Sequence, residues 1–344
     1  GCTNTTSVTV IVNNLPNPII SANPPFVCKG YSTTLNANVP NGKTYNWQPA
    51  ISLSSPTDPN PIATPNINTI YSVTVTDVNG CSAKDTILIT VYNSPTLSLS
   101  YPGPICVGSS TVITATTIGS PISSYNWYPL AEIIKDPTTA TPTVQPATTT
   151  QFNLTVTDIN GCTAKDSITI VVNPYPVADA GPDQTICSED KITLHASGGN
   201  SYSWSNGANT DTTSIMPLNN SFPLKDTTYK YIVTVTSNAC SSKDSVYITV
   251  KPLPLANAGT DISICFSDSA SLSASGGGSY LWSTTDTAYS IKVAPYQTTT
   301  YVLTVTLNGC SKTDDVTVFV LPLYAVNAGN DIIICHKDSA TITS

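Results

Sequence analysis

Tyr71-Ser-Val-Thr-Val-Thr-Asp-Val-Asn-Gly-Cys81 alternates aromatic or β-branched residues with threonine and ends in a turn and a cysteine. Such alternation is typical of a half-buried β-strand, and Asn79-Gly80 is a residue pair that tight hairpin turns favour. A second alternating run, Asp85–Val91, follows the cysteine. The sequence therefore predicts a β-hairpin that carries a cysteine at its turn.

The same hairpin recurs three more times along the chain. The further copies of its first strand and turn are Phe152–Cys162, Tyr231–Cys240 and Tyr301–Cys310, and the further second strands are Asp166–Val172, Asp244–Val250 and Asp315–Val320. Regular self-similarity on this scale is the signature of tandem repeats, each a supersecondary unit or small domain.

Two further features precede each hairpin. One is a first cysteine (Cys28, Cys106, Cys187 and Cys265), and the other is a Tyr-x-Trp motif whose tryptophans are Trp47, Trp127, Trp204 and Trp282. One tryptophan per repeat, in the middle of a strand, is what a β-sandwich uses at the centre of its core. These four side chains are the predicted core aromatics.

The order of these features predicts an all-β chain of tandem immunoglobulin-like or PKD-like β-sandwich repeats in an elongated array. The predicted organisation is the last strand of a preceding repeat, four complete repeats, and the start of a following repeat. The ranges are 1–14, 15–92, 93–173, 174–251, 252–321 and 322–344.

The composition argues against several classes of function. Only 10% of the 344 residues are charged, the net charge is −8, and all 13 basic residues are lysines, so nucleic-acid binding is not expected. No run of about 18 apolar residues predicts a membrane span. The two histidines, His195 and His336, belong to no catalytic motif. The chain is therefore predicted to be non-enzymatic and to need no cofactor.

Ten cysteines at regular intervals favour a disulfide framework formed in an oxidising compartment. Zinc sites place cysteines in pairs two to four residues apart, whereas neighbours here are about 25 residues apart, so no metal site is predicted. Asp77 with Asn79, and Asp158 with Asn160, could offer oxygens to Ca²⁺ at the hairpin turns, but turn formation explains these residues better.

Three motifs carry a resemblance to a known repeat type. They are Ala180-Gly-Pro-Asp-Gln-Thr-Ile-Cys187, Tyr202-Ser-Trp-Ser205, and the hairpin followed by Lys165-Asp-Ser167. The chain resembles the tandem PKD-like, SprB-like repeats of giant secreted surface adhesins of Bacteroidota. The resemblance implies an extracellular location at the bacterial cell surface, export by the type IX secretion route, and a role in cell adhesion or gliding-type motility.

Two disulfide patterns are open. The first cysteine is expected at the start of the second strand of its repeat and the second cysteine beyond the end of a strand that runs the same way, which places them at opposite ends. Pairing between neighbouring repeats is therefore favoured: Cys28–Cys162, Cys106–Cys240 and Cys187–Cys310, with Cys2, Cys81, Cys265 and Cys335 pairing with repeats outside this chain. The alternative pairs lie within one repeat: Cys28–Cys81, Cys106–Cys162, Cys187–Cys240 and Cys265–Cys310.

Asp-Ser or Asp-Thr followed by a small or apolar residue recurs along the chain and is similar to the O-glycosylation site of Bacteroidota secreted proteins. The candidate glycosylated residues are Thr86, Ser167, Ser245, Ser269, Thr287 and Ser339. The competing interpretation is that each aspartate caps a turn or the start of a strand.

The predicted function is a structural repeat segment of a long extracellular cell-surface adhesin or filament, stiffened by disulfides between neighbouring domains. Its expected partners are neighbouring repeats, like chains in a fibre or bundle, and surface glycans. One alternative is a glycan-binding module whose variable loops, Ala131–Thr143 and Ser205–Ser221, hold the sugar. Another is a passive spacer of a large secreted hydrolase.

Overall fold

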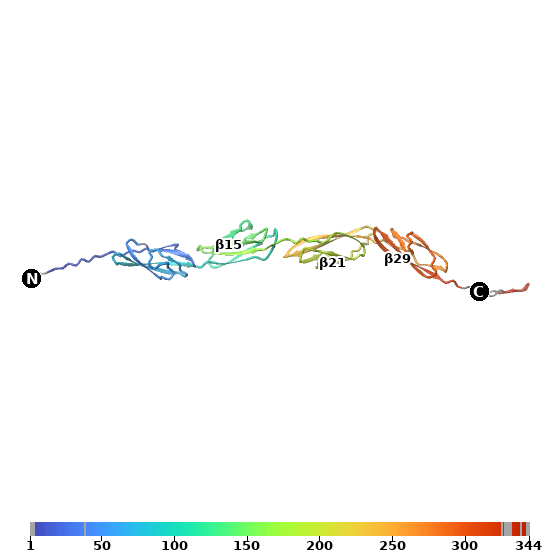
Figure 1. Ribbon diagram of the computed structural model, residues 1–344, viewed down its shortest axis with the longest axis horizontal. Helices are drawn as coiled ribbons and strands as arrows, with labels where there is room; N and C mark the ends of the chain where they lie inside the picture. Colours follow the sequence, from blue (N-terminus) through green and yellow to red (C-terminus); the bar gives the residue numbers. More distant parts are fainter. Residues whose placement is uncertain (1–3, 38, 325, 327–331, 338, 342–344) are drawn as a thin grey trace. The chain divides into compact units, whose positions relative to one another are not determined.

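The computed structural model describes residues 4–37, 39–324, 326, 332–337 and 339–341, and it places strands but no helix among them (Figure 1). None of the described residues therefore forms a helix that could cross a membrane. The chain divides into two compact units. Unit 1 comprises Gly1–Tyr175 with Asn238–Cys240, and unit 2 comprises Pro176–Ser237 with Ser241–Ser344.

The first core of unit 1 lies between two antiparallel-rich sheets, with strand orders β1-β3-β5 and β2-β7-β6-β4. The strands are β1 (Ser21–Asn23), β2 (Phe26–Cys28), β3 (Thr33–Asn36), β4 (Gly42–Gln48), β5 (Ile62–Ala63), β6 (Thr69–Asp77) and β7 (Ser82–Tyr92). The hairpin predicted around Cys81 is confirmed, because β6 and β7 pair antiparallel from Thr69 opposite Ile89 to Thr76 opposite Ser82.

The second core of unit 1 has the same hairpin at its centre, here β15 and β16, in a sheet of order β12-β15-β16. Its strands are β8 (Thr96–Ser100), β9 (Ile105–Cys106), β10 (Thr111–Val112), β11 (Thr114–Ile118), β12 (Ile122–Tyr128), β13 (Ile133–Lys135), β14 (Thr143–Val144), β15 (Thr150–Asp158), β16 (Thr163–Ile170) and β17 (Val172–Asn173). The remaining sheets have the orders β11-β8, β10-β14-β13 and β17-β9.

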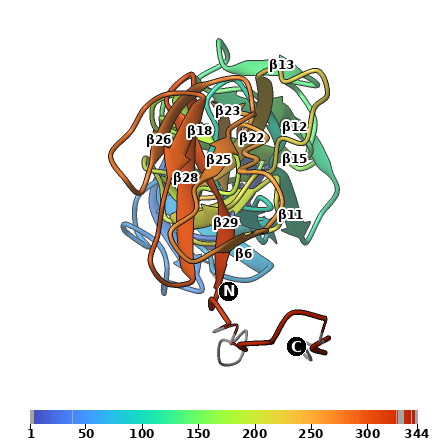
Figure 2. The same ribbon diagram turned by 90° about the vertical axis from the view of Figure 1, so that its right-hand side faces the viewer.

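Unit 2 contains two more sandwiches, each built from one four-stranded and one two-stranded sheet. The orders are β18-β23-β22-β20 with β19-β21, and β24-β29-β28-β26 with β25-β27. Figure 2 shows strands β26, β28 and β29 of the last sandwich toward the viewer. The strands are β18 (Gln184–Cys187), β19 (Ile192–His195), β20 (Ser201–Trp204), β21 (Thr212–Ile215), β22 (Thr227–Ser237), β23 (Cys240–Lys251), β24 (Ile262–Cys265), β25 (Ala270–Ser273), β26 (Ser279–Trp282), β27 (Ser290–Val293), β28 (Thr299–Leu307) and β29 (Cys310–Leu321).

Each sandwich has its own core with one tryptophan inside. Trp47, Trp127, Trp204 and Trp282 are all buried, each in a different hydrophobic cluster. Each indole nitrogen donates a hydrogen bond to a backbone carbonyl, those of Asp58, Thr139, Thr210 and Ala288. Since a buried indole N–H needs a partner, the loop after each tryptophan strand is anchored to the core.

The pairing pattern makes the chain a series of tandem immunoglobulin-like β-sandwiches, which confirms the predicted fold class. The four cores fall within the predicted repeats 15–92, 93–173, 174–251 and 252–321. The two flanking ranges were predicted as the last strand of a preceding repeat and the start of a following one. Their described residues, and all of residues 4–20, lie in no strand. A strand is defined by its pairing, and no neighbouring strand pairs with these residues.

Candidate functional site: the disulfide junctions

Three disulfides follow one rule. Bonds join Cys28 to Cys162, Cys106 to Cys240, and Cys187 to Cys310, with Cα–Cα distances of 5.7, 5.7 and 5.6 Å. Each bond joins the first cysteine of one predicted repeat to the second cysteine of the next. Each closes a loop of more than 120 residues, as the sequence separations of 134, 134 and 123 show. On the chain-entropy account such loops contribute up to about 4–5 kcal/mol each.

The pairs within one repeat, Cys28–Cys81, Cys106–Cys162, Cys187–Cys240 and Cys265–Cys310, do not form, and strand register gives the reason. Cys28 ends β2, which runs parallel to β7 with Cys28 opposite Tyr92. Cys81 immediately precedes β7, eleven residues before Tyr92, so the two cysteines are separated by about 36 Å along the strand. A disulfide needs Cα atoms within about 7 Å.

The sequence argument placed the first cysteine on the wrong strand. It expected Cys28 at the start of the second strand, whereas the structure puts it at the end of the three-residue strand β2, before β3 begins at Thr33. The same holds for Cys265, which ends β24 opposite Leu321 while Cys310 begins β29. The expected position, at the start of the second strand, and the observed position, at the end of β2, both lie far from the second cysteine of the same repeat. The preference for pairing between repeats is therefore the same for either position.

A buried aspartate shapes the turn that carries Cys162. One oxygen of Asp158, Oδ1, accepts hydrogen bonds from the backbone N–H groups of Asn160 and Cys162, at 2.9 and 2.8 Å. Asp77 makes the same two bonds to Asn79 and Cys81. These contacts are turn chemistry, as the sequence favoured over Ca²⁺ binding. Among the described residues no group of three or more His, Cys, Asp or Glu lies together as a metal site.

The residue just before the second cysteine adopts positive φ in every repeat. Gly80, Gly161 and Gly309 have φ of 84, 79 and 88°, and Ala239 has φ of 66°. Glycine takes this conformation without a steric penalty, whereas alanine does so at a cost. The position before the cysteine thus has positive φ in all four turns, although the turns before Cys240 and Cys310 are one residue shorter and these two cysteines begin their strands.

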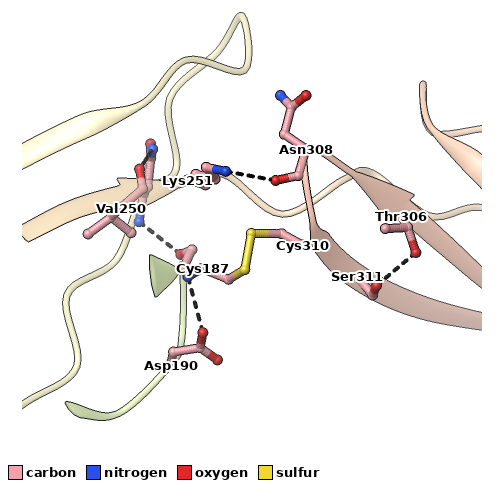
Figure 3. Close-up of a disulfide and its surroundings, with 10 residues drawn as sticks. Cys187, Asp190, Val250, Lys251, Thr306, Asn308, Cys310 and Ser311 are labelled. Atoms are coloured by element: carbon pink, nitrogen blue, oxygen red, sulfur yellow. Dashed lines mark hydrogen bonds between the residues drawn. A yellow bond between two sulfur atoms is a disulfide. The ribbon is translucent and has the colours of Figure 1, made fainter. Parts of the chain in front are cut away.

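A second contact accompanies two of the disulfides. Asn173, opposite Cys106 in the β9–β17 pair, donates from Nδ2 to the carbonyl of Asn238 at 3.0 Å. Lys251, opposite Cys187, donates from Nζ to the carbonyl of Asn308 at 2.9 Å (Figure 3). The last residue of the strand beside the first cysteine, β17 or β23, therefore donates to the turn that carries the second cysteine of the same disulfide. Sequence reasoning missed this role, because asparagine and lysine share no motif at the position.

The junction at Cys28 and Cys162 differs from the others in its lining. A cavity of about 580 Å³ opens beside Cys28, and its walls include Phe26, Tyr31 and Ile159. Tyr31 and Ile159 are largely exposed, and Phe26 packs edge-to-face on Tyr92 with ring centroids 5.6 Å apart. The positions equivalent to Phe26 and Tyr31 elsewhere are Pro104 and Ser109, and Thr185 and Asp190.

The candidate glycosylation residues lie mostly on the surface. Thr86, Ser167, Ser269, Thr287 and Ser339 are exposed, and Ser245 is half-buried. The aspartates before them have structural partners in several cases. Asp85 accepts a hydrogen bond from the backbone N–H of Ile20 at 3.0 Å, and Asp244 accepts one from Ala180 at 2.8 Å. The aspartates therefore hold the first residues of the sandwich against the hairpin.

One of the two loops named as glycan-binding alternatives is anchored from within. Within Ser205–Ser221, Asn219 is buried and donates from Nδ2 to the carbonyls of Lys225 and Val250, so it anchors the loop.

Cys81, Cys265 and Cys335 are free thiols in the structure, and Cys2 lies outside the described residues.

No protein-family model matches the chain. No curated protein matches its sequence. Solved structures of tandem domains do match over long spans. Sidekick-1 immunoglobulin domains 1–5 share 12% identity over 87% of this chain and 78% of that one, with a TM-score of 0.28.

Two further structures match in the same way. A three-immunoglobulin-domain structure of titin, an E-to-A mutated variant, shares 14% identity over 70% of this chain and all of that one, with a TM-score of 0.36. The ICAM-5 D1–D4 ectodomain fragment shares 9% identity over 89% of this chain and all of that one, also with a TM-score of 0.36. The immunoglobulin-like assignment itself comes from the strand pairing.

Structural disulfides persist in oxidising compartments and are rare in the cytosol. The three bonds and the four tandem sandwiches indicate an extracellular repeat segment.

Proposed function

We propose that the chain is a structural segment of a long cell-surface adhesin or filament of a bacterium, in which disulfides between neighbouring repeats stiffen the array. The observation that carries the proposal is that, among the described residues, all three disulfides join one predicted repeat to the next and none closes a single repeat. Bonds within a repeat would stabilise independent domains, whereas bonds between repeats restrict their relative motion. The repeat resemblance supports adhesion and gliding-type motility as the process served, and export by the type IX route.

The test uses the source organism. Antibodies against the folded chain should label intact cells, and deletion of residues 93–251 should shorten the surface structure and weaken attachment or gliding. This deletion removes two predicted repeats and leaves Cys28 in register to pair with Cys310. Release of the protein into the medium together with a hydrolase activity, without surface labelling, would favour the spacer alternative instead.

The cavity beside Cys28 favours glycan binding as a second candidate function. Tyr31 and Phe26 offer aromatic faces, on which sugar rings stack, beside the polar side chains of Ser32, Asn160 and Thr163. Replacement of both aromatic residues by alanine should abolish binding to a glycan array if this function is correct. Equal binding by the variant and the parent protein would exclude this cavity as the site.

We also propose O-glycosylation at Thr86 and Ser167. Both lie on the second strand of a hairpin with their side chains exposed, and each follows an aspartate whose carboxylate accepts a hydrogen bond from the backbone N–H of that threonine or serine. Mass spectrometry of the protein from its native source should find a glycan on these two residues and none on Ser245, which is half-buried. Unmodified Thr86 and Ser167 would support turn chemistry alone.

A further inference from the structure

The spacing of the cysteines has two parts, one nearly constant and one variable. We call the stretch from the second cysteine of a repeat to the first cysteine of the next a connecting segment. The connecting segments that follow the four hairpin turns are Cys81–Cys106, Cys162–Cys187, Cys240–Cys265 and Cys310–Cys335, and in each the residue numbers differ by 25, while those of Cys2 and Cys28 differ by 26. The sandwich segments between them, 29–80, 107–161, 188–239 and 266–309, vary from 44 to 55 residues.

The disulfides join alternate connecting segments into two continuous covalent paths. Path A runs up to Cys28, crosses to Cys162, follows the backbone to Cys187, and crosses to Cys310. Path B runs from Cys81 to Cys106, crosses to Cys240, and follows the backbone to Cys265. Each sandwich segment leaves one path at its first cysteine and joins the other path at its second. The sandwich segments are therefore bridges between the two paths.

The two paths lie side by side in every repeat. The strand that ends in the first cysteine belongs to one path, and the last strand of the hairpin belongs to the other. These strands are parallel, hydrogen-bonded neighbours in all four sandwiches. The pairs are β2 with β7, β9 with β17, β18 with β23, and β24 with β29.

From this connectivity we infer that tension applied to the two ends of this chain is carried by path A, and that the sandwich segments with their tryptophan cores lie outside the route of the force. Pulling on a chain extends its shortest covalent route first. Between Cys28 and Cys310 that route holds only the connecting segment Cys162–Cys187, because the disulfides bypass separations of 134 and 123 residues. This inference deepens the proposed function, because it states how such a stalk would resist unfolding under load.

Single-molecule force spectroscopy on the whole oxidised chain, held at its two ends, tests the inference. The parent protein should show no release of a complete repeat, which would add on the order of 25 nm for about 75 residues. Cys187→Ser with Cys310→Ser breaks path A. The shortest covalent route from Cys28 to Cys310 then crosses to Cys162, runs back along the backbone to Cys106, crosses to Cys240 and follows the backbone to Cys310. The maximum extension should therefore rise by about 35 nm, the length of roughly 100 added residues.

The matched control removes a bond that the force does not cross. Cys106→Ser with Cys240→Ser breaks path B, which ends at the free thiols Cys81 and Cys265, so the maximum extension should not change although this bond closes 134 residues. A gain in the control equal to that in the path A variant would overturn the inference. Steps of whole-repeat size in the oxidised parent protein would do the same.

Reduction of the parent protein provides a measurement that needs no variant to fold. A thiol reductant should lengthen the maximum extension by about 90 nm, since both bypassed separations then join the route. No gain on reduction would contradict the inference. This extension measurement does not depend on antibody labelling of cells. Failure of the force inference can therefore be distinguished from failure of the proposed surface location.

Discussion

At the scale of single residues, the four hairpin turns allow a direct comparison. The residue before the second cysteine has positive φ in each turn, and the third repeat alone uses alanine there. Around Gly309 a Cβ atom would meet no neighbour within 4 Å, so φ alone opposes a side chain at that position. The sequence identified these turns from Asn-Gly, but Ala239 could be placed in the same turn only by aligning it with the other copies.

Ala239→Gly should therefore stabilise the β22–β23 hairpin by about 0.5–1 kcal/mol, because it relieves the strain of alanine at φ 66°. Hydrogen exchange of the hairpin amides, followed by mass spectrometry, should show slower exchange. The reverse change, Gly309→Ala, should speed exchange in β28–β29 by a similar energy. Faster exchange in Ala239→Gly would show that the turn does not carry this strain.

Neighbouring aspartates in the fourth repeat give a second comparison. Asp314 accepts a hydrogen bond from the buried N–H of Ala258 at 2.8 Å, whereas Asp315 is exposed. Asp314→Ala should destabilise this repeat by about 1.5–3 kcal/mol, because it removes a charged acceptor from a buried donor. Asp315→Ala should change stability by less than about 0.5 kcal/mol. Urea titrations in which unfolding of repeat four is followed by hydrogen exchange of its peptides measure the stability of both variants. Equal losses of stability would contradict the assignment.

At the scale of elements, the hairpins were predictable and the short strands were not. Strands such as β6 and β28 are nine residues long with strict alternation, so local pattern determines them. β2 and β9 have three and two residues, too few to show a period, and they exist because a parallel neighbour provides their hydrogen bonds. This is why the first cysteine was assigned to the wrong strand.

The contacts that hold elements together across long separations were also beyond sequence pattern. Ile20 and Asp85 are 65 residues apart, and nothing local in either segment indicates that the carboxylate receives that amide. The sequence register was likewise one residue off in the fourth repeat, where the hairpin strand was begun at Asp315. Asp85 and Asp244 each lie four residues after the cysteine of their hairpin turn. Asp314 lies four residues after Cys310, so Asp314 and not Asp315 is the equivalent residue.

At the scale of the whole molecule, the disulfides overlap along the sequence. Together they span every peptide bond from Cys28 to Cys310 without a gap. A cut at any one of these bonds therefore leaves two pieces that a disulfide still joins. A chain of sandwiches without bonds between repeats would separate at the first cut.

A protease site inserted after Leu255, which is largely exposed, measures this property. After cleavage the protein should migrate as one species without reductant and as two with it, because only Cys187–Cys310 spans that position. In the variant Cys187→Ser with Cys310→Ser, the cleaved protein should separate into two fragments without reductant. Separation of the parent protein before reduction would show that the bond is absent in solution.

The interval between the cysteines of a connecting segment, 25 residues after each of the four hairpin turns and 26 from Cys2 to Cys28, bears on how such a chain can diverge after its repeats are duplicated. Insertions and deletions in a sandwich segment alter the loops of one domain and leave the distance between successive crosslinks unchanged, as the range of 44 to 55 residues illustrates. A single insertion in a connecting segment would instead displace a cysteine from its partner. Selection should therefore preserve length in one class of segment and permit variation in the other, so that loops diversify while the crosslinked frame is inherited intact.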